Sequence, residues 1–140
     1  MNLYDPIRQK DVSATPEEAV RQQTLHFLTE KLNVPAHLIA IEFPLCHIKK
    51  SSRDRVDILV HDFRESHSIS KPWLLVECKA PGEYTWMKLE VQLNRYLKIL
   101  TPSFLMLALG DTVRFFEWNI EAGRFFQRKE LPEYPQINNL

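Results

Sequence analysis

Two stretches of the chain decide the fold, RVDILV (residues 55–60) and WLLVECK (residues 73–79), in which residues 73–78 are the expected strand and Lys79 follows at its end. The first is rich in β-branched residues and the second is almost continuously apolar, so each predicts a strand, and the second suits a central strand covered on both faces. Both strands also carry charge, because Asp57 lies inside the first and Glu77 and Lys79 end the second. Charged residues are unusual there unless they are paired or functional, so these three are candidates for chemistry.

A helix is predicted before the first of these strands. The stretch TPEE (residues 15–18) supplies a capping threonine, a proline suited to the first helical position and two acids at the positive end of the helix dipole. Leucines at helical spacing extend the pattern to Lys31 or Asn33, and Pro35 ends it.

The remaining elements follow from the alternation of apolar runs and turn residues. A second amphipathic helix is predicted within residues 85–100, because its apolar residues recur three and four apart and Pro102 follows it. Strands are predicted at residues 39–45, 104–109 and 113–118, with a short one at residues 124–127. A hairpin turn is expected at Gly110-Asp111.

The order of helix, three strands, helix and further strands predicts an α/β fold in which helices flank a mixed central sheet. We expect a polar, irregular N-terminal arm over residues 1–15, a single domain over residues 16–130 and a loose C-terminal tail over residues 131–140. The length of 140 residues suits one domain.

Composition limits the functional classes without choosing one. The formal net charge is +0, from 18 basic and 18 acidic residues, so the chain lacks the basic excess of many nucleic-acid-binding domains, although a local basic face stays open. The N-terminal stretch has no apolar signal segment, and no apolar run approaches the length of a membrane helix. Cys46 and Cys78 fit a reduced cytoplasmic protein, and the five histidines lack zinc-finger spacing.

Asp57, Glu77 and Lys79 would share a small volume if their strands are neighbours. Side chains alternate along a strand, so Glu77 and Lys79 face the same side. Mg²⁺ prefers oxygen ligands, which Asp57, Glu77 and the Cys78 carbonyl could supply. Lys79 could then hold or deprotonate the attacking water and offset charge on a phosphodiester.

A purely structural interpretation stands beside this one. Glu77 and Lys79 could form a solvent-facing ion pair worth about 0–1 kcal/mol. Asp57 could cap a nearby turn or pair with Arg55. An acid followed some twenty residues later by E-x-K also occurs by chance.

The second helix adds a polar pair. Gln92 and Tyr96 are four residues apart and therefore neighbours on one helix face. Gln92 lies beside the apolar stripe, from where it could reach over the sheet toward the site. The plainer alternatives are a surface amide for Gln92 and core packing for Tyr96.

The stretches RVDILV, WLLVECKAP and QLNRY resemble the N-terminal nuclease domain of type I restriction enzyme R subunits, and more closely its short stand-alone bacterial relatives. That resemblance implies a PD-(D/E)XK, restriction-endonuclease-like fold with an α-β-β-β-α-β core, hydrolysis of DNA phosphodiester bonds, and Mg²⁺ as cofactor with Mn²⁺ as a substitute.

The resemblance also assigns roles to residues. Asp57, Glu77 and Lys79 match the three motif positions, and Gln92 and Tyr96 match the helix motif. Glu18, followed three residues later by Arg21, matches a first-helix acid that in some members helps hold the metal. Glu17 is a neighbouring alternative for that position.

Two departures qualify the resemblance. Val56 stands where the motif has proline, and no G-x-x-x-x-G-K-[ST] phosphate loop occurs, so these residues supply no motor. Full restriction would therefore need a partner subunit with the motor and the sequence recognition. The alternatives are a catalytically quiet DNA-binding or assembly module of a larger restriction or repair complex, or an unrelated α/β interaction domain. The sequence leaves the oligomeric state open, a dimer included.

Overall fold

Eight strands and two α-helices make up the computed structural model, which describes residues 1–136. In chain order the elements are β1 (Asn2–Asp5), β2 (Lys10–Ser13), α1 (Pro16–His26), β3 (Ile39–Pro44), β4 (Arg55–Val60), β5 (Leu74–Cys78), α2 (Trp86–Leu97), β6 (Phe104–Ala108), β7 (Val113–Asn119) and β8 (Arg124–Arg128). A π-helical turn, Phe27–Lys31, continues α1, and short 3₁₀ turns lie at Ala36–Leu38, Leu45–His47 and Phe63–Glu65.

The main sheet has six strands in the order β3-β4-β5-β6-β7-β8. Its neighbours are antiparallel except for β5 and β6, which run parallel and are joined through α2. A parallel pair needs a crossover connection, and α2 supplies it. The predicted α/β class and the α-β-β-β-α-β order are thereby confirmed, with α1 preceding β3 and α2 standing between β5 and β6.

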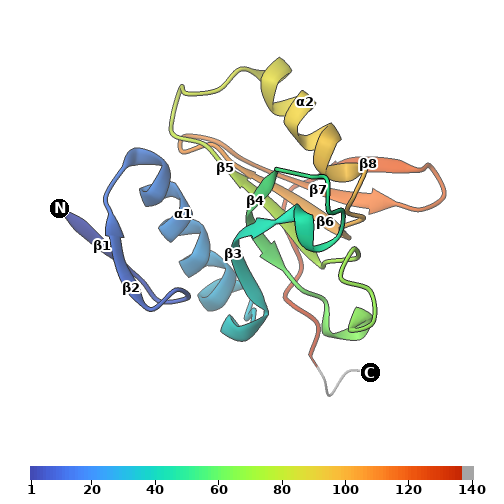
Figure 1. Cartoon of the computed structure of the whole chain (residues 1–140), viewed down its shortest axis with the longest axis horizontal. Helices are drawn as coiled ribbons and strands as arrows, with labels where there is room; N and C mark the ends of the chain where they lie inside the picture. Colours follow the sequence, from blue (N-terminus) through green and yellow to red (C-terminus); the bar gives the residue numbers. More distant parts are fainter. Residues whose placement is uncertain (137–140) are drawn as a thin grey trace.

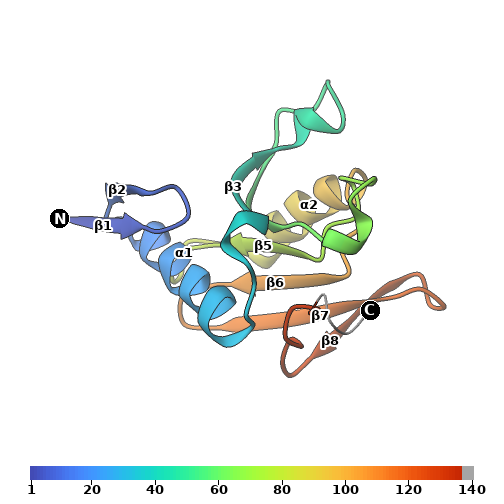
Figure 2. The same cartoon turned by 90° about the horizontal axis from the view of Figure 1, so that it is seen from below.

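The two helices cover opposite faces of the sheet (Figure 1, Figure 2). Leu25 of α1 and Leu28 of the π-helical turn that continues it pack against a face that includes Val76. Helix α2 packs Leu89 and Leu93 against the other face, in a second apolar cluster. All five residues of β5 are buried, as expected for a central strand between two layers.

Helix α1 begins as the sequence predicts. Thr15 has extended backbone dihedrals and its hydroxyl accepts the Glu18 N–H at 3.1 Å, while Pro16 takes the first helical position. This cap fixes which faces of α1 the acids Glu17 and Glu18 occupy.

The N-terminal residues differ from the irregular arm that the sequence predicts. β1 and β2 form an antiparallel hairpin beside α1 (Figure 1). Its turn is built on Asp5, whose buried Oδ1 accepts the N–H groups of Ile7 at 2.9 Å and Arg8 at 2.8 Å. An aspartate that hydrogen-bonds the backbone two and three residues on makes a tight turn without glycine, so the usual turn signal was missing.

The C-terminal residues are also more ordered than the loose tail that the sequence predicts. Leu131 and Tyr134 belong to the α1-side core, and the Tyr134 ring lies edge-on to Trp73 at 5.0 Å between centroids. The Tyr134 hydroxyl donates to the His61 carbonyl at 2.7 Å and accepts the Phe63 N–H at 3.0 Å. The last part of that predicted tail, residues 137–140, lies outside the described residues.

Two further findings bear on the protein's environment. Cys46 is exposed, Cys78 is buried, and both thiols are free. Across residues 1–136, none of the helices has the length and apolar character needed to span a bilayer.

Tyr134 gives a test of this packing. Replacing Tyr134 by Phe leaves the partly buried His61 carbonyl and Phe63 N–H without their partner, which should lower the free energy of unfolding by about 1–3 kcal/mol. Replacing it by Ala also removes the ring and should cost about 3–5 kcal/mol. Urea denaturation measures both. Tyr4→Phe is the matched control, because Tyr4 is 60% exposed and should change stability by less than about 0.5 kcal/mol. A Tyr134→Ala variant as stable as this control would show that the tail does not pack as described.

Candidate active site

The strand register brings Asp57 and Glu77 face to face. β4 and β5 pair through Ile58 and Val76, and one further step of the same register sets Asp57 opposite Glu77. Opposed residues of an antiparallel pair have Cβ atoms about 4.5–5.5 Å apart. The backbone ladder ends at this step, where Asp57 Oδ2 accepts the Cys78 N–H at 2.8 Å in place of a backbone carbonyl. Asp57 therefore holds the end of β5 while its carboxylate lies next to that of Glu77.

Glu77 is a buried acid, and one of its two carboxyl oxygens has no hydrogen-bond partner among the described residues. The residue is 1% exposed, and its Oε1 has no hydrogen-bond donor within the described part of the chain. Oε2 lies 3.5 Å from the Tyr96 hydroxyl. Burial, together with the charge and hydrogen-bonding contact of Asp57, raises the pKa of Glu77 to about 9. In the absence of a bound cation, Glu77 is accordingly protonated at neutral pH.

Lys79 lies two residues beyond Glu77 and on the same side of the strand. Its backbone N–H donates to the Ala108 carbonyl at 2.9 Å, which extends the pairing with β6 past the end of β5. Lys79 is half-buried as a residue, and its positive charge lowers the pKa of both Glu77 and Glu17, opposing the effect of burial on each. Lys79 thus adds positive charge to the side of the site where two acids face it.

The polar pair of helix α2, Gln92 and Tyr96, lies next to Glu77 through the Tyr96 hydroxyl. Gln92 Nε2 donates to the Tyr96 hydroxyl at 2.7 Å, and that hydroxyl donates to the Arg55 carbonyl at 3.0 Å. The Tyr96 pKa is raised, because the hydroxyl is buried and lies near the Glu77 carboxylate. Tyr96 packs in the core below α2, and its hydroxyl also contacts Glu77.

The two acids of the first helix turn lie in different surroundings. Glu18 is 8% exposed, accepts Arg21 Nη1 at 2.6 Å and is also bonded by Arg8. Its carboxylate is joined to Asp57 through Arg21. Glu17 is half-buried, and its pKa is raised by burial and by the charge of Asp57. The charge of Asp57 therefore reaches Glu17, an acid of the first helical turn.

Sequence reasoning left Arg21 and Glu42 without a role, yet Arg21 lies between Asp57 and Glu42 and contacts both acids. The Arg21 side chain is 7% exposed, and its Nη2 lies 3.5 Å from Asp57 Oδ1 and 3.7 Å from Glu42 Oε1. Glu42 interrupts β3 with a φ of 52°, a left-handed conformation that non-glycine residues seldom adopt. The signal for Glu42 was its position as the one charged residue in the strand stretch IAIEFPL.

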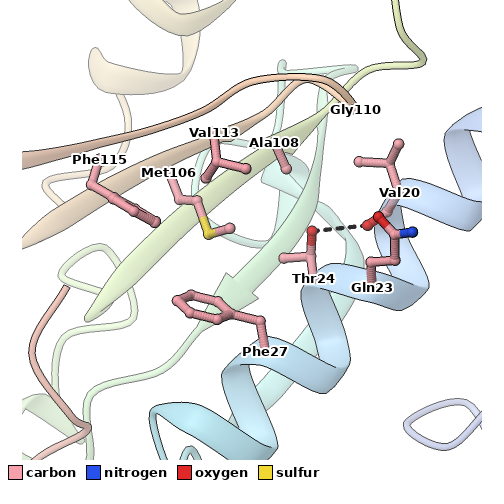
Figure 3. A pocket seen from close by; sticks show the side chains of 9 residues that line it. All are labelled: Val20, Gln23, Thr24, Phe27, Met106, Ala108, Gly110, Val113 and Phe115. Atoms are coloured by element: carbon pink, nitrogen blue, oxygen red, sulfur yellow. Dashed lines mark hydrogen bonds between the residues drawn. The ribbon is translucent and has the colours of Figure 1, made fainter. Parts of the chain in front are cut away.

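A separate cavity of about 230 Å³ lies between α1 and the β6–β7 part of the sheet (Figure 3). Apolar side chains such as Phe27, Met106 and Phe115 line it, and the Thr24 hydroxyl is turned back to the Val20 carbonyl at 2.9 Å. No acidic or basic side chain of residues 1–136 lines this cavity. It therefore offers none of the chemistry gathered around Asp57.

Comparison with protein families identifies the family of the chain. The family described as the type I restriction enzyme R protein N terminus (HSDR_N) matches residues 16–132. The chain belongs to this family. Searches of curated proteins and of solved structures returned no significant match. Membership in a type I restriction family supports a restriction-related role for the chain.

The oxygen atoms around Asp57 and Glu77 determine whether the candidate site suits a divalent cation. Among residues 1–136, no cluster of three or more acidic, histidine or cysteine side chains stands ready to bind a metal. The paired carboxylates of Asp57 and Glu77 nevertheless fit one, because the buried Glu77 Oε1 is an acceptor without a donor. A strand residue turns its N–H and carbonyl to the same neighbour, so the Cys78 carbonyl is directed to the Asp57 side, where its N–H is bonded.

The raised pKa of Glu77 predicts how stability depends on pH without added metal. The unfolded chain ionises Glu77 near its ordinary pKa of 4.5, and the folded chain does so only near 9. The stabilising effect of the bound proton is complete below pH 4.5. It is lost as pH rises toward 9, at up to about 1.4 kcal/mol per pH unit.

Thermal or urea unfolding in EDTA across this range measures the slope. Glu77→Gln is neutral at every pH and should flatten the curve. Glu83→Gln, at an exposed acid of the loop after β5, should leave the slope of the wild type. A wild-type profile as flat as that of Glu77→Gln would rule out the raised pKa.

Proposed function

We propose that the chain is a metal-dependent nuclease domain that hydrolyses DNA phosphodiester bonds and carries no motor of its own. The observation that carries this proposal is the Asp57–Glu77 pair at the end of β5, with a buried, unpartnered Glu77 oxygen and Lys79 on the same side. Membership in the type I R protein N-terminal family supports the same conclusion.

Mg²⁺ is the proposed cofactor, with Mn²⁺ able to replace it. Asp57, Glu77 and the Cys78 carbonyl would hold the ion, because hard oxygen ligands suit it and it needs only a few from the protein. Glu17 lies near enough to Asp57 for the Asp57 charge to raise the pKa of Glu17. Glu17 is therefore a further proposed metal ligand, on the α1 side of the site. The family resemblance assigned that place to Glu18 with Glu17 as the alternative, and the bonds of Glu18 to two arginines favour Glu17. When bound, Mg²⁺ supplies Lewis-acid stabilisation of charge on the phosphate and lowers the pKa of its water.

The residues of the chain have separate parts in this proposal. Asp57 orients the end of β5 through the Cys78 N–H. Lys79 donates hydrogen bonds to the attacking water or to a phosphate oxygen, where negative charge develops. Tyr96, held by Gln92, contacts Glu77 and fixes the direction of its carboxylate. DNA is the proposed substrate, and a partner subunit would supply the motor and the specificity.

A second candidate is a catalytically quiet DNA-binding or assembly module of a restriction or repair complex. Two observations favour it. The formal charge is +0, which gives little long-range attraction to DNA. The Arg21 guanidinium also lies beside Asp57, where it already offsets part of the charge that a metal ion would offset.

Mn²⁺ binding separates the two candidates without a guess about the substrate. We expect the wild type to bind Mn²⁺ saturably and Asp57→Asn to bind it at least tenfold more weakly, because one of two carboxylates becomes a neutral amide. Isothermal titration calorimetry measures both. Asp111→Asn, at an exposed acid in the β6–β7 turn, is the control and should bind as the wild type does. Equal binding by wild type and Asp57→Asn would place the ion elsewhere.

Cleavage of radiolabelled DNA in Mg²⁺ or Mn²⁺ tests the chemistry itself. Lys79→Ala should lower the rate of cleavage at least a hundredfold, since it removes a donor to the charge formed in the transition state. Its circular dichroism spectrum and Mn²⁺ affinity should stay near those of the wild type. A Lys79→Ala variant that cleaves as fast as the wild type would contradict the proposed role. DNA binding that falls with salt, without cleavage in either metal, would favour the quiet module.

A further inference from the structure

Three carboxylate residues occupy one row across three neighbouring strands. In the β3–β4 register, Ile41 faces Ile58 and Phe43 faces Val56, so Glu42 stands opposite Asp57. In the β4–β5 register, Asp57 stands opposite Glu77. Neighbouring strands are about 4.8 Å apart, so the row places acids at successive strand spacings. Only the Asp57–Glu77 half of this row is used by the proposed function.

The Arg21 guanidinium bridges the other half of the row. Its Nη2 is 3.5 Å from Asp57 Oδ1 and 3.7 Å from Glu42 Oε1. Its Nε is buried and has no acceptor among the described residues, so the group does not satisfy all its donors in this position. A buried, incompletely bonded cation between two carboxylates indicates a place where positive charge is required.

The position of Arg21 is set by a chain of alternating charges. Asp5 accepts Arg8 Nε at 2.7 Å, Arg8 bonds Glu18, and Glu18 accepts Arg21 Nη1 at 2.6 Å. Asp5 is fully buried, and the side chains of Glu18 and Arg21 are at most 10% exposed. The anchor on Glu18 leaves Nη2 free to face Asp57 and Glu42.

We propose that the Arg21 guanidinium takes the place of a second cation, between Glu42 and Asp57, so that the chain binds one divalent ion where the row of acids would otherwise hold two. Two-metal phosphodiesterase sites place their ions about 3.5–4 Å apart, which fits a second position beside a shared carboxylate. In this arrangement Asp57 is the shared carboxylate. The inference rests on the proposed function for the first ion, at Asp57 and Glu77.

The left-handed backbone of Glu42 is accounted for by this arrangement. A φ of 52° in the middle of a strand is unfavourable for a residue with a Cβ. Strain of this kind is retained where the surroundings hold it, commonly at functional positions. Here it accompanies a Glu42 carboxylate that meets the same nitrogen of Arg21 as Asp57 does.

The test is a titration with Mn²⁺ alone, in which electron paramagnetic resonance counts the ions bound to each chain. We expect one Mn²⁺ for the wild type and two for Arg21→Gln, because removing the guanidinium leaves Glu42 and Asp57 without a counter-charge. The double variant Arg21→Gln/Glu42→Gln should return to one. The second ion of Arg21→Gln should bind at least tenfold more tightly than any second ion of the wild type.

Arg64→Gln is the matched control. Arg64 also pairs with a buried carboxylate, Asp62, in the turn that follows β4. The same substitution frees an acid that has no row of acids beside it, so Arg64→Gln should bind one Mn²⁺. A second ion in this control would show that any freed carboxylate binds Mn²⁺, and it would overturn the inference.

The remaining outcomes separate this inference from the proposed function. One ion in both wild type and Arg21→Gln overturns the role of Arg21 and leaves the first site intact. No ion in the wild type but one in Arg21→Gln, lost on Glu42→Gln, overturns the first site and supports the role of Arg21. A second ion that does not need Glu42 overturns the inference. If Arg21→Gln fails to fold, Mn²⁺ should restore its circular dichroism spectrum, and failure to do so also overturns it.

Discussion

The hydrogen bond from the Cys78 N–H to Asp57 is the contact on which the site depends. It replaces the next rung of the β4–β5 ladder, so the two strands stop pairing where the acids stand. One carboxylate oxygen of Asp57 is thereby used to hold the backbone, and the other stays available to Arg21 or a cation. The same bond keeps Glu77 in register with Asp57, which brings two acids into a volume where only one ionises readily.

Burial of the Asp57–Glu77 pair changes how the two acids ionise. An acid pair in water would simply ionise, but Glu77 lies under α2, where the Tyr96 ring and the leucines of the helix exclude solvent. Because the charged form is disfavoured there, the pair either keeps a proton or gains a cation. Lys79, beyond the end of β5, and Arg21, beside Asp57, each supply part of the missing positive charge.

The sequence predicted the elements better than the contacts between them. RVDILV and WLLVEC carry strand periodicity and burial in their own composition, so β4 matches its predicted bounds and β5 begins one residue later than predicted. The proximity of Asp57 and Glu77 could be predicted from the sequence, because it requires only that their two strands be neighbours. The position of Glu42 opposite Asp57 could not be predicted, because it depends on the β3–β4 register and on a positive φ at Glu42. A strand pattern in the sequence encodes neither. The sequence could not decide between Glu17 and Glu18 as the metal ligand, because the decision depends on the bond of Arg8 to Glu18. Arg8 belongs to a hairpin whose turn is made by Asp5 without the usual glycine, so the hairpin was not predicted.

The alternating charges that run from the N-terminal hairpin to the site have an evolutionary consequence. Asp5, Arg8, Glu18 and Arg21 each neutralise the next, so the loss of one member leaves a buried charge of the opposite sign. Single substitutions along this chain are therefore costly, whereas paired substitutions that remove adjacent opposite charges are tolerated. Relatives that lack Arg21 should consequently differ at Glu18 and Arg8 as well, and these positions should vary together across the family, independently of the motif residues of β4 and β5.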